Sequence, residues 1–227
     1  MTLDALNYAI AWPEIFLLIM ACVILVVDVF LEDERRNLTY LLSQLTLLAT
    51  CALVVSGGTD QRVLAFNDMF VQDSMADTLK LFILAITFVI YVYSRDYLRE
   101  RNIFKGEFYV LGLFGVLGMM IMVSSSNLLV LYLGLELMSL CLYAMVAFDR
   151  DNGNASEAAM KYFVLGAIAS GMLLYGMSIL YGLSGSLAIA DIATAVSATE
   201  AGTCLLYTSD AADEDCLVGW GGGGGGV

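Results

Sequence analysis

Six long apolar segments occupy most of the first 183 residues and constrain the fold more than any other feature of this sequence. They run from about 13–31, 38–56, 76–94, 108–123, 128–148 and 157–183. A helix needs about 20 mostly apolar residues to cross roughly 30 Å of hydrocarbon, and the segments are close to that length. Hydrophobic residues make up 60% of the chain and charged residues 15%, against about 45–50% and 25% in a typical soluble protein. The sequence therefore predicts an all-α fold, a polytopic transmembrane helical bundle with six spans.

The fourth and fifth spans are separated only by the polar tetrad Ser124-Ser125-Ser126-Asn127. Without it, the uncharged run from Phe108 to Leu135 would form one helix that greatly overshoots the bilayer. We therefore expect a tight turn at the tetrad.

Glycines recur in the fourth and sixth spans, and aromatic residues lie near several span ends. Small residues allow membrane helices to approach closely, so the glycines predict helix packing. Aromatic side chains near span ends are typical of the membrane interface. The glycines are Gly112, Gly115, Gly118, Gly166, Gly171 and Gly176, and the aromatic residues are Trp12, Tyr91, Tyr93 and Tyr181.

Basic residues are distributed unevenly between the loops. The loops after the first, third and fifth spans carry Arg35, Arg36, Arg95, Arg99, Arg101, Lys105 and Arg150. The other side carries Arg62, with Lys80 just inside the third span. Because basic loops favour the cytoplasm, we expect them there and the N-terminus outside. The first fifteen residues contain no Lys or Arg, which favours a membrane span over a cleaved signal peptide.

The composition argues against several kinds of chemistry. The chain has no histidine, which removes histidine metal sites, Ser-His-Asp triads and histidine proton shuttles. A net charge of −13 with ten Lys and Arg leaves no basic patch for nucleic acid. No motif for a nucleotide, flavin, haem or iron–sulfur cluster is present, so we expect no metal, no cofactor and no redox centre in this chain. The five cysteines contain no CxxC pair and predict neither a zinc site nor a disulfide framework: Cys22, Cys51, Cys141, Cys204 and Cys216.

Glu136 is the strongest candidate for a functional residue, because ionisable groups within a membrane span are costly and usually functional. It lies about 12 Å along the fifth span, too deep to reach water at either end. Tyr132, Ser139 and Tyr143 share its helix face at spacings of four, three and four residues. Such a polar stripe should face the bundle interior or a water-filled cavity. A carboxyl group there can load and release a proton, although a protonated glutamate that only bonds a neighbouring helix is the alternative.

Lys161, Asp28 and Glu14 are further ionisable residues within predicted spans. Lys161 is about one and a half turns into the sixth span, roughly 10 Å along the axis from the level of Glu136, so a direct ion pair is not expected. Interfacial placement accounts for Asp28 near the end of the first span. Glu14 follows Pro13 and is interpreted as a first-turn acid favoured by the helix dipole.

Residues 131–182 resemble subunit N of bacterial NADH-quinone oxidoreductase, respiratory complex I. The most specific stretches surround Glu136 and Glu157-Ala158-Ala159-Met160-Lys161-Tyr162, with weaker agreement at Pro13-Glu14-Ile15-Phe16 and Leu111-Gly112-Leu113-Phe114. The resemblance covers about residues 1–201.

The resemblance implies an antiporter-like fold of fourteen helices, of which this chain would supply the N-terminal six. It implies a place among the membrane-arm subunits of a proton-pumping complex in the bacterial inner membrane. NADH, FMN, iron–sulfur clusters and quinone would be bound elsewhere in the complex. Glu136 and Lys161 match the proton-path glutamate and a lysine of the sixth helix. The family's helix-seven lysine has no counterpart here, so the chain should not pump as it stands.

Two other functions stay open: a structural or assembly module of the same complex, and a subunit of a cation/proton antiporter. The domain prediction is a transmembrane domain over 1–201 and a non-native tail over 202–227. Residues 204–214 resemble a translated sequencing adapter, and six glycines follow near the end. A genuine acidic, glycine-rich linker is the alternative for this tail.

Overall fold

The computed structural model describes residues 8–31, 37–58, 62–101, 106–149 and 152–198. The predicted tail over 202–227 lies outside these residues. The chain divides after Leu174 into two compact units, which are considered separately. The first contains a short 3₁₀ helix η2 (Tyr8–Ala11) and helices α1 (Trp12–Val29), α2 (Asn37–Gly57), α3 (Ser74–Glu100), α4 (Glu107–Val123) and α5 (Leu128–Val146), with strands β1 (Val63–Ala65) and β2 (Phe70–Gln72).

The helix α6 (Gly153–Ser184) crosses the division between the units, and α7 (Ile189–Ala198) lies in the second unit. Gly185 follows α6 with a φ of +68°. Its amide donates to the Tyr181 carbonyl oxygen. A left-handed residue bonded back onto the last turn is a common helix ending, and glycine adopts this conformation without steric cost.

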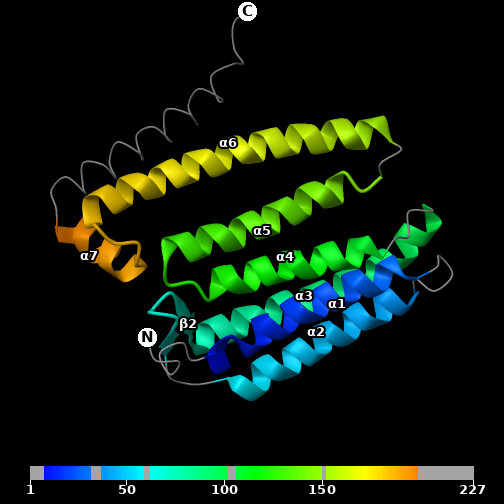
Figure 1. Ribbon diagram of the computed structural model, residues 1–227, viewed down its shortest axis with the longest axis horizontal. Coiled ribbons are helices and arrows are strands. Elements are labelled where there is room, and N and C mark those ends of the chain that lie inside the picture. The colour runs from blue at the N-terminus through cyan, green and yellow to red at the C-terminus, as the bar shows by residue number, and fades with distance from the viewer. Residues whose placement is uncertain (1–7, 32–36, 59–61, 102–105, 150–151, 199–227) are drawn as a thin grey trace, which may run out of the picture. The chain divides into compact units, whose positions relative to one another are not determined.

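The expectation of a polytopic helical bundle is confirmed. Five helices (α1, α2, α3, α5 and α6) are long and apolar enough to cross a membrane, and α4 is a shorter apolar helix of 17 residues. All six cover the predicted spans within a few residues, except that α3 continues to Glu100 and α6 begins at Gly153. Figure 1 shows α1 to α5 lying side by side as neighbouring rods.

Local signals account for where several helices begin. The Asp73 carboxylate accepts a hydrogen bond of 2.7 Å from the Ala76 amide and caps α3. The Asn127 side chain caps α5 by accepting 2.9 Å from the Leu129 amide. Pro13 lies in the first turn of α1, where its missing N–H leaves no helical bond unmade. Each cap satisfies a backbone donor that the start of a helix leaves without a partner.

The core of the first unit lies among α1, α2, α3 and α4. Its fully buried side chains include Leu17, Ile24, Leu84 and Leu113. Tyr91 also belongs to this core at 2% exposure, so its prediction as an interfacial aromatic is wrong. Because α3 extends past the predicted span end, Tyr91 lies inside the bundle rather than at its edge.

A two-stranded hairpin, which the sequence did not predict, precedes α3. Strands β1 and β2 pair antiparallel, with Ala65 opposite Phe70. The turn between them places Phe66, Asn67 and Asp68 at φ values of 54°, 56° and 62°. Three consecutive non-glycine residues in the left-handed region are unusual, and contacts elsewhere must hold them there.

The predicted turn at the polar tetrad is confirmed and also pairs with this hairpin. The Val71 amide donates to the Ser124 carbonyl oxygen at 2.8 Å. The Ser126 amide donates to the Met69 carbonyl oxygen at 3.0 Å, and its hydroxyl donates to the Asp68 carbonyl oxygen. The tetrad thus acts as a third segment beside the hairpin, which ties the α4–α5 connection to the residues before α3.

The glycine packing prediction is confirmed where a glycine faces another described helix, and no described residue tests it at Gly171 and Gly176. A Cβ added at Gly118 would lie 2.6 Å from the Gly134 carbonyl oxygen, and a Cβ at Gly112 would collide with the Tyr91 hydroxyl. Gly115 has only an ordinary contact, 3.9 Å from the Cβ of Cys141. The three predicted packing glycines of α6 differ from one another. Gly166 is packed against Tyr143, whereas Gly171 and Gly176 have no atom of the described chain within 4 Å.

Candidate functional site

Glu136 lies near the middle of α5, half-buried on the helix surface. It is about 12 Å along the axis from the start of α5 and about 15 Å from the end. The carboxyl group is therefore at membrane depth.

The partner of Glu136 is Ser170 on α6, a residue that the sequence interpretation missed. The Ser170 hydroxyl donates to Oε1 of Glu136. The Tyr132 hydroxyl lies 3.2 Å from the same serine oxygen. A carboxyl group and two hydroxyl groups from two helices thus form one polar cluster. Ser170 follows Gly166 by one helical turn, so a small-residue face opposite a polar stripe is the signal that could have identified it.

Tyr143 extends the same face of α5 toward α6. Its ring packs edge-on against Tyr162 and Phe163, with centroids 4.7 and 5.7 Å apart. Its hydroxyl occupies the space that a side chain at Gly166 would need. Three members of the predicted stripe therefore face α6. Ser139 is half-buried and forms no side-chain hydrogen bond within the described parts of the chain.

Lys161 does not join this cluster. Its ammonium pairs with the Glu157 carboxylate at 2.6 Å, one turn earlier on α6, and 71% of its side chain is exposed. Ser170, which marks the level of Glu136, is nine residues further along α6 and about 13 Å away along the axis. The expected axial gap between Lys161 and Glu136 is therefore present in the structure.

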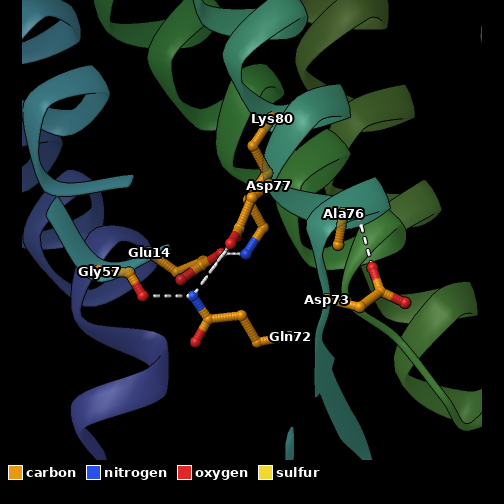
Figure 2. Close-up of polar contacts among 7 residues, drawn as sticks. All are labelled: Glu14, Gly57, Gln72, Asp73, Ala76, Asp77 and Lys80. Carbon is orange, nitrogen blue, oxygen red and sulfur yellow. Dashed lines mark hydrogen bonds and ion pairs between the residues drawn. The ribbon is translucent and has the colours of Figure 1, made fainter. Parts of the chain in front are cut away.

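A second charged site, which the sequence did not predict, joins Glu14 on α1 to Lys80 on α3. The Lys80 Nζ lies 2.6 Å from Oε1 of Glu14, and the two side chains are 1% and 6% exposed. The Phe70 ring lies 5.2 Å from the Lys80 ammonium. Figure 2 shows Lys80 and Asp77 reaching from α3 toward Glu14. Glu14 is in the first turn of α1 as expected, and it has a direct partner in Lys80 that the sequence did not predict.

At the other end of α1, the Asp28 side chain has contacts within the protein in addition to its position near the predicted membrane interface. Its carboxylate accepts 2.6 Å from the Thr39 hydroxyl. A Cβ at Gly106 would collide with this carboxylate. Arg99, at the corresponding end of α3, donates 2.6 Å to the Asn37 side chain of α2. These contacts tie helix ends together and bring no further group to Glu136.

Among the described residues no three His, Cys, Asp or Glu side chains could hold a metal ion. Cys22, Cys51 and Cys141 are free thiols. What the α5–α6 cluster can do is proton chemistry: a carboxyl group accepts or gives up a proton, and hydroxyl groups donate to it.

Comparisons with known proteins show which proteins these helices resemble. Residues 125–209 match the family model described as NADH:quinone oxidoreductase/Mrp antiporter, TM. NADH-quinone oxidoreductase subunit N of Thioalkalivibrio sulfidiphilus is 56% identical over 202 residues, which is 89% of this chain and 42% of that protein. Subunit N of Alkalilimnicola ehrlichii is 51% identical over 200 residues, or 88% of this chain and 41% of that protein. The chain thus spans about two fifths of the length of the curated relatives it matches.

Solved structures of respiratory membrane complexes also contain chains with a similar fold. A chain of respiratory complex I from Thermus thermophilus with bound aureothin matches with a TM-score of 0.67 and 25% identity, covering 82% of this chain and 41% of that one. A chain of the membrane-bound sulfane sulfur reductase, an archaeal respiratory membrane complex, matches with a TM-score of 0.64 at 22% identity over 83% and 40%. The second match shows the shared fold alone. The resemblance seen in the sequence is therefore confirmed, and this multi-pass membrane chain is similar in sequence and fold to part of the subunit N proteins of NADH-quinone oxidoreductase.

Proposed function

We propose that this chain is part of a proton-translocating membrane subunit of an NADH-quinone oxidoreductase, in which Glu136 takes up and releases the proton. The observation that carries the proposal is the cluster of Glu136, Ser170 and Tyr132 in the middle of two membrane-length helices. The printed names of relatives at 51–56% identity support the same activity.

The chemistry follows from the surroundings of the carboxyl group. Glu136 is half-buried and accepts a hydrogen bond from the Ser170 hydroxyl. Its carboxyl oxygens can accept or give up a proton while that hydroxyl group holds the side chain between α5 and α6.

The other predicted site residues have supporting roles in this proposal. Lys161 is a second station on the proton path, about 13 Å from the level of Glu136, where Glu157 holds its ammonium. Water would have to bridge that gap, since a proton moves only between groups in hydrogen-bond contact. Tyr132 extends the hydroxyl cluster, Tyr143 packs the helices together, and Ser139 offers a further hydroxyl on the same face.

The remaining parts of the proposal concern the assembly. The partners are the lipid bilayer and other membrane-arm subunits of respiratory complex I. NADH, FMN, iron–sulfur clusters and quinone are bound elsewhere in that complex. The chain lies in a bacterial inner membrane, with its basic loops in the cytoplasm and its N-terminus in the periplasm.

The test is Glu136→Gln in the complete oxidoreductase, with Glu100→Gln as the control. Glutamine keeps the size and the hydrogen-bond acceptor but cannot carry the proton. We expect E136Q to assemble normally and to lose proton translocation, while E100Q, at the exposed end of α3, behaves as the wild type. Normal proton-to-electron stoichiometry in E136Q would refute the proposal. It would favour the structural alternative, in which bulky changes at Gly112 block assembly.

A second candidate is a cation/proton antiporter, because the description of the matching family model names both groups of proteins. Growth that depends on sodium or potassium in a strain relying on this gene would favour the antiporter. Co-purification with NADH dehydrogenase activity would count against it.

A further inference from the structure

The Glu14–Lys80 pair is a second intramembrane charge site that the α5–α6 cluster does not use. Both residues lie near the starts of their helices, the third residue of α1 and the seventh of α3. Both side chains are more than nine-tenths buried. Because taking charged groups out of water is costly even when they are paired, the pair requires an explanation beyond packing.

The carboxylate of this pair is only half satisfied. Oε1 of Glu14 contacts the Lys80 ammonium at 2.6 Å. Oε2 is buried and has no hydrogen-bond partner among the described residues. A buried polar atom without a partner carries a desolvation cost, which a proton or a water molecule at that atom would relieve.

Two further polar side chains, Asp77 and Gln72, lie beside this pair. Asp77 lies one turn before Lys80 on α3 and is half-buried. The Gln72 side chain lies 3.3 and 3.4 Å from the two Asp77 oxygens and donates 2.9 Å to the Gly57 carbonyl oxygen. In Figure 2 the carboxylates of Glu14 and Asp77 and the Lys80 ammonium converge between α1 and α3, with Gln72 beside them. Burial therefore decreases stepwise from Lys80 through Glu14 to Asp77.

The hairpin also covers the pair. The Phe70 ring of β2 lies 5.2 Å from the Lys80 ammonium. Gln72 comes from the same strand, and β2 is tied to the tetrad after α4 by backbone hydrogen bonds. An aromatic ring thus lies against the ammonium, while the Gln72 side chain of the same strand donates to the Asp77 carboxylate.

We propose that Glu14 and Lys80 form a second proton-exchange site, at the hairpin end of the bundle, that exchanges protons with water on the Asp77 side. This inference rests on the proposed function. In the proposed exchange, a hydronium ion passes its excess proton to Oε2 of Glu14. One O–H bond breaks in the hydronium ion, one forms at Oε2, and neutral water is left. The site then holds a neutral acid beside the ammonium and has a net charge of +1. Release of that proton to water restores the ion pair, so charge and atoms balance.

Among the described residues, the charged groups that lie beside Glu14 are Lys80 and Asp77 on α3. Gln72 and Phe70 contribute no charge from the hairpin. The described surroundings of the Glu14 carboxylate therefore contain one ammonium and one further carboxylate, both from α3.

The decisive variant is the double substitution Glu14→Gln with Lys80→Met in the complete oxidoreductase. It removes both charges together, so no uncompensated buried charge remains to unfold the bundle. The control is Asp96→Asn, an exposed change at the far end of α3. We expect the double variant to assemble and to show a loss of protons translocated per NADH, while D96N matches the wild type. Wild-type stoichiometry in an assembled double variant would overturn the proposal and leave a purely structural ion pair.

A second measurement uses the wild-type complex and does not depend on how the variant folds. A hydrophobic carbodiimide modifies protonated carboxyl groups, and mass spectrometry locates the product. A proton-exchange site predicts modification of Glu14 that increases as pH falls. No modification of Glu14 between pH 6 and 8 would overturn the proposal even if the double variant failed to assemble. Loss of pumping in E136Q with normal pumping in the double variant would refute only the second site, whereas normal pumping in E136Q would refute the proposed function itself.

Discussion

Gly118 of α4 and Gly134 of α5 lie against each other's backbone, and this contact provides a sharp test of the packing. A Cβ at Gly118 would lie 2.6 Å from the Gly134 carbonyl oxygen and 2.8 Å from the Met138 amide nitrogen. Both are backbone atoms, so no side-chain rotation can make room. Gly115, three residues earlier on α4, has its nearest neighbour at 3.9 Å and is a matched control.

The loss of stability expected for G118A follows from these distances. Moving the added Cβ out to an ordinary contact of about 3.4 Å requires α4 and α5 to separate locally by roughly 0.8 Å. A gap of about 0.5–1 Å forfeits a quarter to a half of the dispersion energy of the atoms that lined it. Overpacking of this kind typically costs about 1–3 kcal/mol. Both Gly→Ala changes gain the same helix propensity, about 1 kcal/mol, so the difference between G118A and G115A isolates the steric cost.

The assay is thermal unfolding in lipid nanodiscs, followed by the reactivity of Cys141 toward a maleimide. Cys141 is buried on α5 at 6% exposure, so it reports separation of α5 from its neighbours. The other four of the five cysteines are replaced by serine. At about 2–4 °C per kcal/mol for a chain of this size, we expect G118A to unfold roughly 2–12 °C below G115A. Equal midpoints for the two variants, or a midpoint for G118A above that of the wild type, would refute the claim that backbone contact limits the α4–α5 distance.

Three further outcomes test other parts of the chain. Asp73→Ala removes the cap of α3 and should lower the free energy of unfolding by about 1 kcal/mol, measured against Asp96→Ala at the far end of the same helix; equal stabilities would contradict the capping role. In the complete oxidoreductase, Ser170→Ala should slow proton translocation without impairing assembly, because it removes the hydroxyl that donates to the carboxyl group of α5. Ser139→Ala should have a smaller effect, and the reverse order would count against the cluster. Long-read sequencing of the source DNA across codons 195–227 should continue in frame into further hydrophobic spans, and an unchanged stop after codon 227 would favour a genuine tail.

Much of the fold could be predicted because the apolar character and the length of a segment can be read from its own residues. A run of apolar residues near 20 long fixes a membrane helix wherever its neighbours lie. The turn at Ser124 to Asn127 was also accessible, since four polar residues interrupt an uncharged run. The hairpin was not, because strands of three residues are too short for an alternating pattern to be recognised.

The same distinction between local pattern and tertiary contact separates the functional residues that could be predicted from those that could not. Tyr132, Glu136 and Tyr143 were found because helical spacing alone places them on one face. Ser170 was missed, since serine in an apolar helix looks like any other small packing residue until its partner is known. The side chain of Tyr91 was misplaced because α3 extends six residues beyond the predicted end at residue 94.

The Glu14–Lys80 pair shows where sequence reasoning stops for charged groups. Glu157 and Lys161 are four residues apart, so helix geometry brings them together without any tertiary information. Glu14 and Lys80 belong to different helices, and only the packing of α1 against α3 decides whether they meet. The cost of burying either charge alone means that both must be accommodated by the same fold. The exposed local pair is therefore readable from spacing, whereas the buried pair, which contributes more to specifying the arrangement of helices, becomes visible only in the structure.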